Sequence, residues 1–173
     1  MICPHCECDN IDGVDICDEC GMSLSHFDPM GSDLEQTITR HSIEALCPRD
    51  PVSIDPATTV REAISTLVAR KIGCLLVEKD DELVGIFSER DVLNKIARDA
   101  NTLDRPVRDF MTPSPVAITR QDSIAYALQA MNMGGYRHLP VVNSVGSPIG
   151  IISVRDILRF LCVRFAELRS QAR

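Results

Sequence analysis

Residues 85–91 read GIFSERD, and residues 150–156 repeat this pattern as GIISVRD, 65 positions later. Upstream of this stretch the same duplication continues at an offset of 64, so that Pro51 is matched by Pro115. One extra residue in a turn explains the change of offset. The chain therefore contains two copies of one unit, and a duplicated unit predicts two similar halves packed about a pseudo-twofold axis.

Hydrophobic periodicity predicts the same order of elements in both copies. In the first copy, Thr59 and Glu62 form a capping box that opens a helix, and apolar residues three and four apart continue this helix through Val68. The other elements predicted for this copy are a strand over 52–54, strands over 74–77 and 83–87, and a helix from Ser88 with Val92, Leu93 and Ile96 on its inner face. Those predicted for the second copy are a strand over 116–118, a helix over 123–131, strands over 138–142 and 149–152, and a last helix from Ser153. The expected fold class is α+β, with a strand-helix-strand-strand-helix unit in each copy.

Two Cys-x-x-Cys pairs near the N-terminus form the second strong pattern. Cys3 and Cys6 make one pair, Cys17 and Cys20 make the other, and ten residues separate them. Four thiolates at this spacing are typical of a structural, tetrahedral zinc site. A module this short buries too little apolar surface to fold alone, so zinc binding, worth on the order of 10 kcal/mol in small zinc peptides, is expected to supply the folding free energy.

The stretch from Cys3 to Leu24 resembles the zinc-ribbon family, which shares the two Cys pairs and an Asn-x-x-Gly turn. Glu7 departs from the family pattern, because such ribbons often have glycine after the second ligand. Cys8 and His5 are further potential ligands, but four thiolates already complete the zinc shell, and His5 is expected to be a solvated residue of the knuckle. A redox role for the Cys pairs would require a thioredoxin-like strand-to-helix context, which the sequence does not predict.

Acidic residues are concentrated in this N-terminal module. Residues 1–30 hold seven Asp or Glu and no Lys or Arg, while the rest of the chain holds 18 acidic and 18 basic residues, so the net charge of −7 arises entirely from the first 30 residues. Nucleic-acid binding depends on clustered Lys and Arg, and nucleic acid is therefore not expected as a partner.

The remaining sequence features predict a cytoplasmic protein without a membrane partner. The apolar runs are far shorter than the roughly 18 residues of a membrane span, and no signal peptide precedes Cys3. Eight cysteines without a disulfide framework indicate a reducing compartment. Cys47, Cys74 and Cys162 lie where the repeat places apolar residues, and we expect them to be small buried hydrophobes.

Residues 43–163 resemble a tandem pair of cystathionine-beta-synthase (CBS) domains, the Bateman module. The resemblance rests on the two duplicated motifs, on VRDFMT at 107–112 and on YRHLPVV at 136–142. The predicted domain boundaries are 1–26 for the zinc ribbon, 27–42 for a linker and lead-in helix, 43–100 and 107–165 for the two CBS repeats, and 153–171 for a C-terminal helix. The lead-in helix is predicted from apolar residues at helical spacing over 33–45.

Each copy has a Ser-x-Arg-Asp sequence where a strand gives way to a helix. The residues alone predict that the serines are N-caps and that the aspartates interact favourably with the helix dipole. A helix N-terminus also attracts phosphate, and a carboxylate can accept two hydrogen bonds from a ribose diol. The resemblance implies that these residues bind an adenosine-containing ligand, AMP, ADP or ATP, with the aspartates on its ribose: Ser88, Arg90, Asp91, Ser153, Arg155 and Asp156. It also implies an adenine site around Val52, Ile54, Val116 and Ile118.

Positive charge distinguishes the two copies. The second has Arg137 and His138 at the start of a strand, where similar nucleotide-binding CBS domains carry basic residues facing phosphate, whereas the first has Gly73 and Cys74. The alternative for Arg137 and His138 is a surface salt-bridge pair. The second copy is thus the first to test for nucleotide binding.

The expected function is regulatory and not enzymatic, because no Ser-His-Asp, Cys-His or phosphate-loop pattern is present in the sequence. An adenine nucleotide would bind in the cleft of the CBS pair, and the zinc ribbon would serve as an output or docking module for a protein partner. The alternative is a ligand-free scaffold whose zinc ribbon recruits another protein. A homodimer through the CBS module is predicted, and apolar residues of the last helix could form its interface or the core: Ile157, Leu158, Leu161, Phe165 and Leu168.

Overall fold

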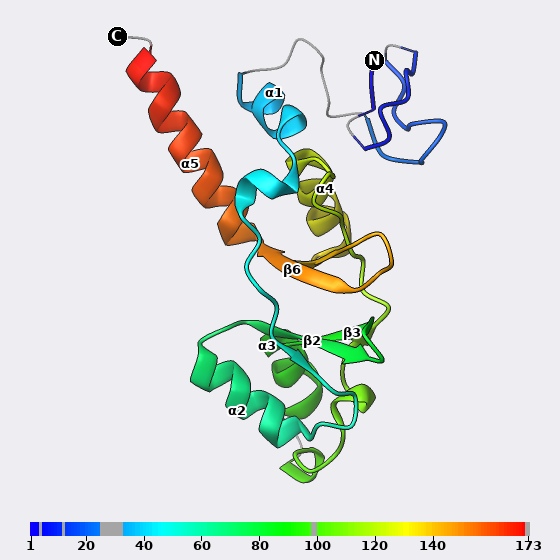
Figure 1. The fold of residues 1–173 in the computed structure, drawn as a ribbon, viewed down its shortest axis with the longest axis vertical. Helices are drawn as coiled ribbons and strands as arrows, with labels where there is room; N and C mark the ends of the chain where they lie inside the picture. Colours follow the sequence, from blue (N-terminus) through cyan, green and yellow to red (C-terminus); the bar gives the residue numbers. More distant parts are fainter. Residues whose placement is uncertain (4, 12, 25–32, 98–99, 172–173) are drawn as a thin grey trace. The chain divides into compact units, whose positions relative to one another are not determined.

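The computed structural model describes residues 1–3, 5–11, 13–24, 33–97 and 100–171 (Figure 1). The chain divides into two compact units. We call the first the helical unit; it comprises Met1–Pro48, Thr119–Arg137 and Ile152–Arg173. The second, the sheet unit, comprises Arg49–Ile118 and His138–Ile151. Each unit therefore combines segments of both sequence copies.

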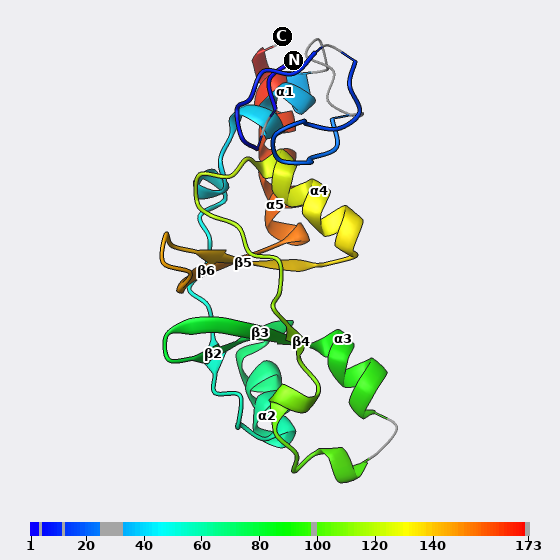
Figure 2. The ribbon, with the colours of Figure 1, turned by 90° about the vertical axis from the view of Figure 1, so that its right-hand side faces the viewer.

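The sheet unit is built on a four-stranded sheet in the order β1-β2-β3-β4. Its elements are β1 (Ser53–Ile54), α2 (Val60–Arg70), β2 (Cys74–Lys79), β3 (Glu82–Ser88), α3 (Glu89–Asp91), the π-helix η2 (Val92–Ile96), the 3-10 turns η3 (Ala100–Thr102) and η4 (Val107–Asp109), and β4 (Thr112–Pro113). β1 is parallel to β2, and the other neighbours are antiparallel. The helices α2 and α3 lie on the same face of the sheet (Figure 2), where Val60, Leu67 and Phe87 form part of the buried core.

The predicted capping box of α2 is confirmed. The Thr59 hydroxyl accepts a hydrogen bond from the Glu62 backbone N–H at 3.3 Å, and the Glu62 carboxylate accepts one from the Thr59 N–H at 3.0 Å. These bonds lower the pKa of Glu62, because they stabilise its charged form. The helix ends at Arg70, and the residue that caps it, Lys71, has a left-handed backbone with φ of 53°.

The leading segment of each copy pairs with the hairpin of the other copy. β4, which belongs to the second copy, pairs with β3 through Gly85–Pro113 and Ile86–Thr112. Conversely, Arg49 exchanges two backbone hydrogen bonds with Ile151, at 3.2 and 3.0 Å. A Cβ at position 85 would overlap the flexible end of the Met111 side chain, so Gly85 leaves room for Met111 in its present position. This exchange of leading segments between the copies gives hydrogen-bond partners to backbone N–H and C=O groups at the edges of the two hairpins.

The helical unit contains α1 (Asp33–Arg40), the 3-10 turn η1 (Ile43–Leu46), α4 (Ile124–Gly134) and α5 (Val154–Gln171). α4 contacts both α1 and α5. Ser123 caps α4 by accepting a hydrogen bond from the Tyr126 N–H at 3.1 Å. No helix among the described residues has the length and apolar character needed to cross a membrane.

A two-stranded hairpin, β5 (His138–Val142) and β6 (Pro148–Ser153), leads into α5. The strand predicted over 116–118 is wrong in extent, because among these residues only Ile118 forms a bridge, parallel to Val141. The prediction of an N-terminal helix over 33–45 is also too long. α1 ends at Arg40, since the backbone N–H of Ile43 donates to Asp122 outside the helix, at 2.8 Å.

The helix predicted from Ser88 is regular for only one short turn. After α3 it continues as the π-helix η2, in which the Ala97 N–H donates to the Val92 carbonyl at 2.9 Å. A π turn holds more residues than an α turn and shifts the facing of side chains. Leu93 is accordingly 69% exposed, and its predicted place on the inner face is wrong, whereas Ile96 is buried as predicted.

Of the three cysteines predicted to be buried hydrophobes, only Cys74 is buried. Burial raises the pKa of its thiol to about 12, so this cysteine remains protonated and unreactive. Cys47 and Cys162 are exposed, and the prediction for them is wrong. The apolar counterparts of these positions in the repeat do not determine their burial, because the two copies pack against different neighbours.

Candidate functional site

The four paired cysteines form a cluster suited to zinc. The Sγ atoms of Cys3, Cys6, Cys17 and Cys20 all lie within 4.8 Å of one another, and the Cys3–Cys20 and Cys6–Cys17 sulfur atoms are each 3.6 Å apart. With Zn–S bonds of about 2.3 Å, the sulfurs of a tetrahedral site would be about 3.8 Å apart. The donor set and its spacing therefore fit a four-thiolate zinc site.

The two knuckles have the same backbone geometry. In the first, the Glu7 N–H donates to the Cys3 carbonyl at 3.0 Å; in the second, the Gly21 N–H donates to the Cys17 carbonyl at 2.9 Å. Both residues have a left-handed backbone, with φ of 57° for Glu7 and 71° for Gly21. Glycine adopts this conformation without cost, whereas a residue with a Cβ is strained in it by roughly 1–2 kcal/mol. The departure from the ribbon pattern at Glu7 thus carries strain.

The thiols of the cluster differ in acidity. Hydrogen bonds, first of all from the Cys20 backbone, lower the pKa of Cys17 to about 6. Desolvation raises the pKa of Cys20 to about 12. One thiol therefore ionises readily while its neighbour resists, and a divalent cation would supply the charge that keeps all four as thiolates near neutral pH.

His5 connects the ribbon to α4. Its ring stacks on Tyr126 with the centroids 3.9 Å apart and the planes 17° from parallel, and its Nδ1 lies 3.4 Å from the Asp122 carboxylate. That nitrogen is buried and makes no hydrogen bond of good geometry, so Asp122 lies near it without accepting a hydrogen bond from it. The prediction that His5 is a solvated knuckle residue is wrong: its side chain is 30% exposed.

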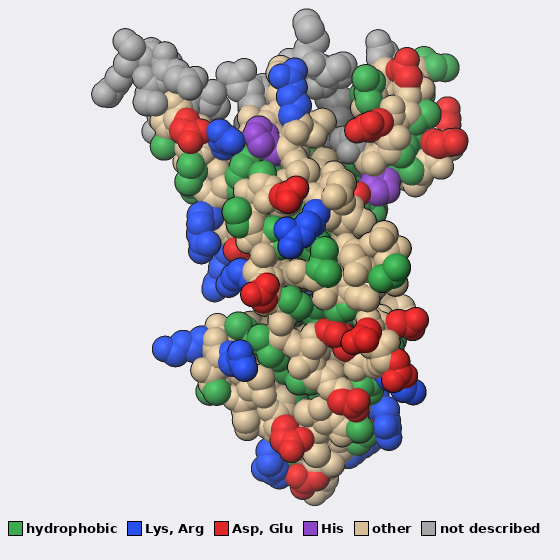
Figure 3. Space-filling model, in the orientation of Figure 1, with side chains coloured by type: hydrophobic (Ala, Val, Ile, Leu, Met, Phe, Trp, Pro, Cys, Tyr) green, Lys and Arg blue, Asp and Glu red, His purple; other side chains and the backbone are tan. Residues whose placement is uncertain are grey.

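Tyr126 also packs against the small core of the ribbon, formed by Cys3, Cys17, Met22 and Leu24. In the first copy the residue matching Tyr126 is Glu62, which completes the capping box of α2. The second copy therefore has an aromatic docking residue where the first has a capping carboxylate. Several acidic side chains lie on the face of the ribbon that Figure 3 shows, among hydrophobic ones.

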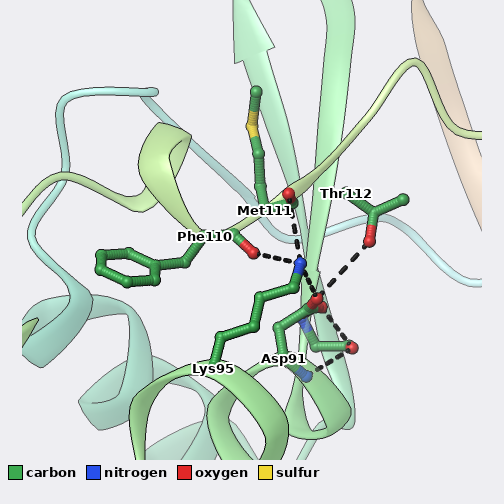
Figure 4. A network of polar contacts seen from close by, with 6 residues as sticks. Asp91, Lys95, Phe110, Met111 and Thr112 are labelled. Atoms are coloured by element: carbon green, nitrogen blue, oxygen red, sulfur yellow. Dashed lines mark hydrogen bonds and ion pairs between the residues drawn. The ribbon is translucent and has the colours of Figure 1, made fainter. Parts of the chain in front are cut away.

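In the first copy the motif aspartate lies in a closed network of polar contacts (Figure 4). One oxygen of Asp91 accepts hydrogen bonds from the Ser88 N–H at 3.0 Å and the Ser88 hydroxyl at 2.6 Å. The other oxygen lies 2.7 Å from the Lys95 ammonium and 3.5 Å from the Thr112 hydroxyl. The Asp91 side chain is 8% exposed. The sequence motif did not reveal Lys95, although it lies four residues after Asp91, the spacing of helical ion pairs.

In the second copy the equivalent serine and aspartate have the same local geometry. Asp156 accepts hydrogen bonds from the Ser153 N–H at 2.8 Å and the Ser153 hydroxyl at 2.6 Å. The Arg159 guanidinium is 3.8 Å from the other Asp156 oxygen and is 77% exposed. The Val154 N–H donates to the Arg137 carbonyl at 3.1 Å. Arg137 thus lies beside Ser153 and Asp156, at the start of an 18-residue helix.

The structure does not place all predicted ligand-binding residues in one unit. Arg137, Ser153, Arg155 and Asp156 belong to the helical unit, whereas Ser88, Arg90, Asp91 and His138 belong to the sheet unit. His138 packs at Gly73: a Cβ added there would lie 3.0 Å from the His138 ring. Of the residues expected around adenine, Val52 and Ile54 pack on the core, Ile118 is 1% exposed, and Val116 is 39% exposed.

A family model described as CBS domain matches residues 43–98 and 107–163. The chain belongs to the CBS-domain family. We therefore call the two copies CBS repeat 1 and CBS repeat 2. A relative from Acidianus ambivalens, described as an uncharacterized 17.7 kDa protein in the bps2 3' region, is 34% identical over 109 residues, which cover 62% of this chain and 65% of the relative. The chain thus spans less than two thirds of that relative.

Solved structures of CBS pairs have the same fold. The CBS domain NE2398 is 30% identical with a TM-score of 0.64, and the match covers 68% of this chain and 94% of that one. The CBS domain protein PAE2072 from Pyrobaculum aerophilum, complexed with AMP, is 28% identical with a TM-score of 0.63, over 73% of this chain and 98% of that one. These matches confirm the predicted tandem CBS pair and its α+β fold class.

Proposed function

We propose that this protein is a non-catalytic regulatory sensor that binds an adenosine-containing ligand, AMP, ADP or ATP, at CBS repeat 2. The observation that carries the proposal is the Ser153–Asp156 pair. Two hydrogen bonds from Ser153 fix one oxygen of the Asp156 carboxylate at the start of α5. A fixed, ionised carboxylate can accept hydrogen bonds from a ribose diol. The AMP bound to the similar protein PAE2072 supports this class of ligand.

The surroundings of Asp156 also suit a phosphate. The N-terminus of the long helix α5 carries partial positive charge, and Arg137, exposed and beside it, adds a full one. Ribose would be bound by Asp156, and phosphate would be attracted by Arg137 and the first backbone N–H groups of α5. Arg155, exposed on the first turn of α5, is a second cation for a longer phosphate chain.

The zinc ribbon is the proposed output module. Cys3, Cys6, Cys17 and Cys20 would hold a structural zinc ion, which supplies the folding free energy of the ribbon and fixes the knuckle that carries His5. Because His5 stacks on α4 and α4 packs on α5, a ligand that changes the packing of α5 can change the docking of the ribbon. A protein partner would distinguish the ribbon that is docked on α4 from the ribbon that is not.

Isothermal titration with AMP, ADP and ATP tests the nucleotide site, with Asp156→Asn as the variant. Loss of a charge-assisted hydrogen bond is expected to weaken binding about 10- to 100-fold. Asp80→Asn, in the exposed turn between β2 and β3, is the matched control and is expected to bind as the unmodified protein does. No heat with any of the three nucleotides, or equal affinity of Asp156→Asn, would contradict the proposal.

A dimerising scaffold remains the second candidate, because α5 has apolar residues on its surface. Leu158 is 54% exposed and Phe165 46% exposed, whereas Ile157 is 1% exposed and belongs to the core. Light scattering of Leu158→Glu is the test of the homodimer: a dimer that becomes a monomer would assign the interface to this helix. A scaffold without ligand would dimerise and give no nucleotide binding.

A further inference from the structure

We infer that Lys95 occupies the aspartate of CBS repeat 1 in place of a ligand, so that the chain binds one adenosine-containing ligand and not two. This inference rests on the proposed nucleotide binding at CBS repeat 2. It assigns different roles to two motifs of nearly the same sequence: Asp91 stabilises the fold, and Asp156 recognises the ligand.

The first step is the hydrogen-bonding capacity of Asp91. A carboxylate has about four acceptor positions on its two oxygens. Ser88 fills two of them through its backbone N–H and its hydroxyl, and Lys95 and Thr112 approach the second oxygen at 2.7 and 3.5 Å (Figure 4). A ribose diol would therefore have to displace donors that the protein itself supplies.

Lys95 is held in this position by more than Asp91. Its ammonium donates to the Phe110 carbonyl at 2.7 Å and lies 3.5 Å from the Met111 carbonyl. An ammonium has three donors, and here each has an acceptor. Figure 4 shows the Lys95 side chain reaching from its helix to this backbone segment, directly above Asp91. Two ribose hydroxyls could still donate to the carboxylate, but they carry no positive charge, so their binding would break the ion pair between Asp91 and Lys95 without replacing it.

CBS repeat 2 has no donor at either of the two matching positions; its Asp156 is approached instead by Arg159, which is 77% exposed and lies 3.8 Å away. The residue that matches Lys95 is Phe160, and the residue that matches Thr112 is Pro48. Neither side chain carries a hydrogen-bond donor. The Phe160 ring instead contacts His41 edge-on, with the centroids 5.3 Å apart. The two repeats thus keep the same serine and aspartate but differ at both positions that close the site in CBS repeat 1.

Reciprocal substitutions test the inference by titration with AMP. The unmodified protein is expected to bind one AMP per chain. Lys95→Met removes the ammonium and is expected to raise the stoichiometry to two. Phe160→Lys introduces an ammonium at the matching position of CBS repeat 2 and is expected to weaken binding about tenfold or more. Phe160→Met, which loses the ring without gaining charge, is the control and should bind as the unmodified protein does.

The outcomes separate this inference from the proposed function. Two AMP per chain in the unmodified protein, with one lost in Asp91→Asn, would overturn the inference and leave nucleotide binding intact. One AMP that is lost in Asp91→Asn but retained in Asp156→Asn would also overturn it. No AMP binding by any of the proteins would reject the proposed function itself. If Lys95→Met does not fold, Phe160→Lys against Phe160→Met still decides the matter, because equal affinities contradict the inference.

Discussion

CBS repeat 1 and CBS repeat 2 contain the same Ser-x-Arg-Asp motif and surround it differently. The aspartate of repeat 1 is contacted by Lys95 of the same repeat and by Thr112 from repeat 2, and the helix α2 begins with a complete capping box. In repeat 2 the closing residues are replaced by Phe160 and Pro48, and the capping glutamate by Tyr126, which docks the ribbon. After a duplication, one copy can thus stabilise the module while the other keeps or acquires contacts with ligands and other domains.

Removal of zinc is expected to have the largest effect, and to affect α4 of CBS repeat 2 but not α2 of CBS repeat 1. If the proposed zinc site supplies folding free energy on the order of 10 kcal/mol, a chelator should unfold the ribbon and expose Tyr126 to solvent. Hydrogen exchange is expected to increase in the ribbon and in α4 but not in α2. Equal protection of α4 with and without the chelator would show that the ribbon does not dock there.

Asp91→Asn is expected to destabilise the protein more than Asp156→Asn. Both changes weaken the same bonds with serine, but the first also breaks the 2.7 Å ion pair between Lys95 and the buried Asp91, whereas the second loses only a 3.8 Å contact with the exposed Arg159. The expected difference in free energy of unfolding is about 2 kcal/mol, reduced from that of a fully buried pair because the Lys95 side chain is 42% exposed. Urea denaturation of both variants without nucleotide measures it, and equal losses would argue against a structural role for Asp91.

Tyr126→Glu makes the start of α4 resemble that of α2. The new glutamate can complete a capping box with Ser123 and removes the ring that stacks on His5. Loss of the stacked pair is expected to weaken ribbon docking by about 1 kcal/mol. The chemical shifts of the His5 ring should move toward those of the free ribbon, whereas Tyr126→Phe, which keeps an aromatic ring, should leave them in place.

The smallest expected effect is a change in zinc affinity when the left-handed residue of either knuckle of the ribbon is replaced. Glu7→Gly removes the strain of a left-handed residue with a Cβ but adds backbone freedom to the unfolded chain. The net gain is expected to be about 0.5 kcal/mol, visible as slightly tighter zinc binding in competition with a chromophoric chelator. The reverse change in the second knuckle, Gly21→Ala, should weaken zinc binding.

Local patterns predicted most of the secondary structure. The capping box of α2, the two hairpins and the four-cysteine cluster depend on residues close together in sequence, and the structure contains all of them. The exchange of leading segments was not predicted, because pairs such as Arg49–Ile151 join residues about a hundred positions apart. The π turn of η2 was missed because an apolar pattern does not reveal a change in helix type.

The site was predictable in its motif but not in its asymmetry. The Ser-x-Arg-Asp pairs were found from the repeat, and charge alone pointed to the second copy through Arg137. The residue that separates the two sites, Lys95, had a sequence signal: it follows Asp91 by four positions, and its match in the other copy is Phe160. The contact of His5 with Tyr126 had no signal in the sequence, since a stacked pair between distant segments depends on tertiary packing.

Native mass spectrometry of the protein titrated with AMP tests the central claim most directly, because it counts the ligands on each chain. We predict a single added AMP per chain at saturation, present in Asp91→Asn and absent in Asp156→Asn. Two AMP per chain, or a single one that persists in Asp156→Asn, would contradict the division of roles between the two CBS repeats.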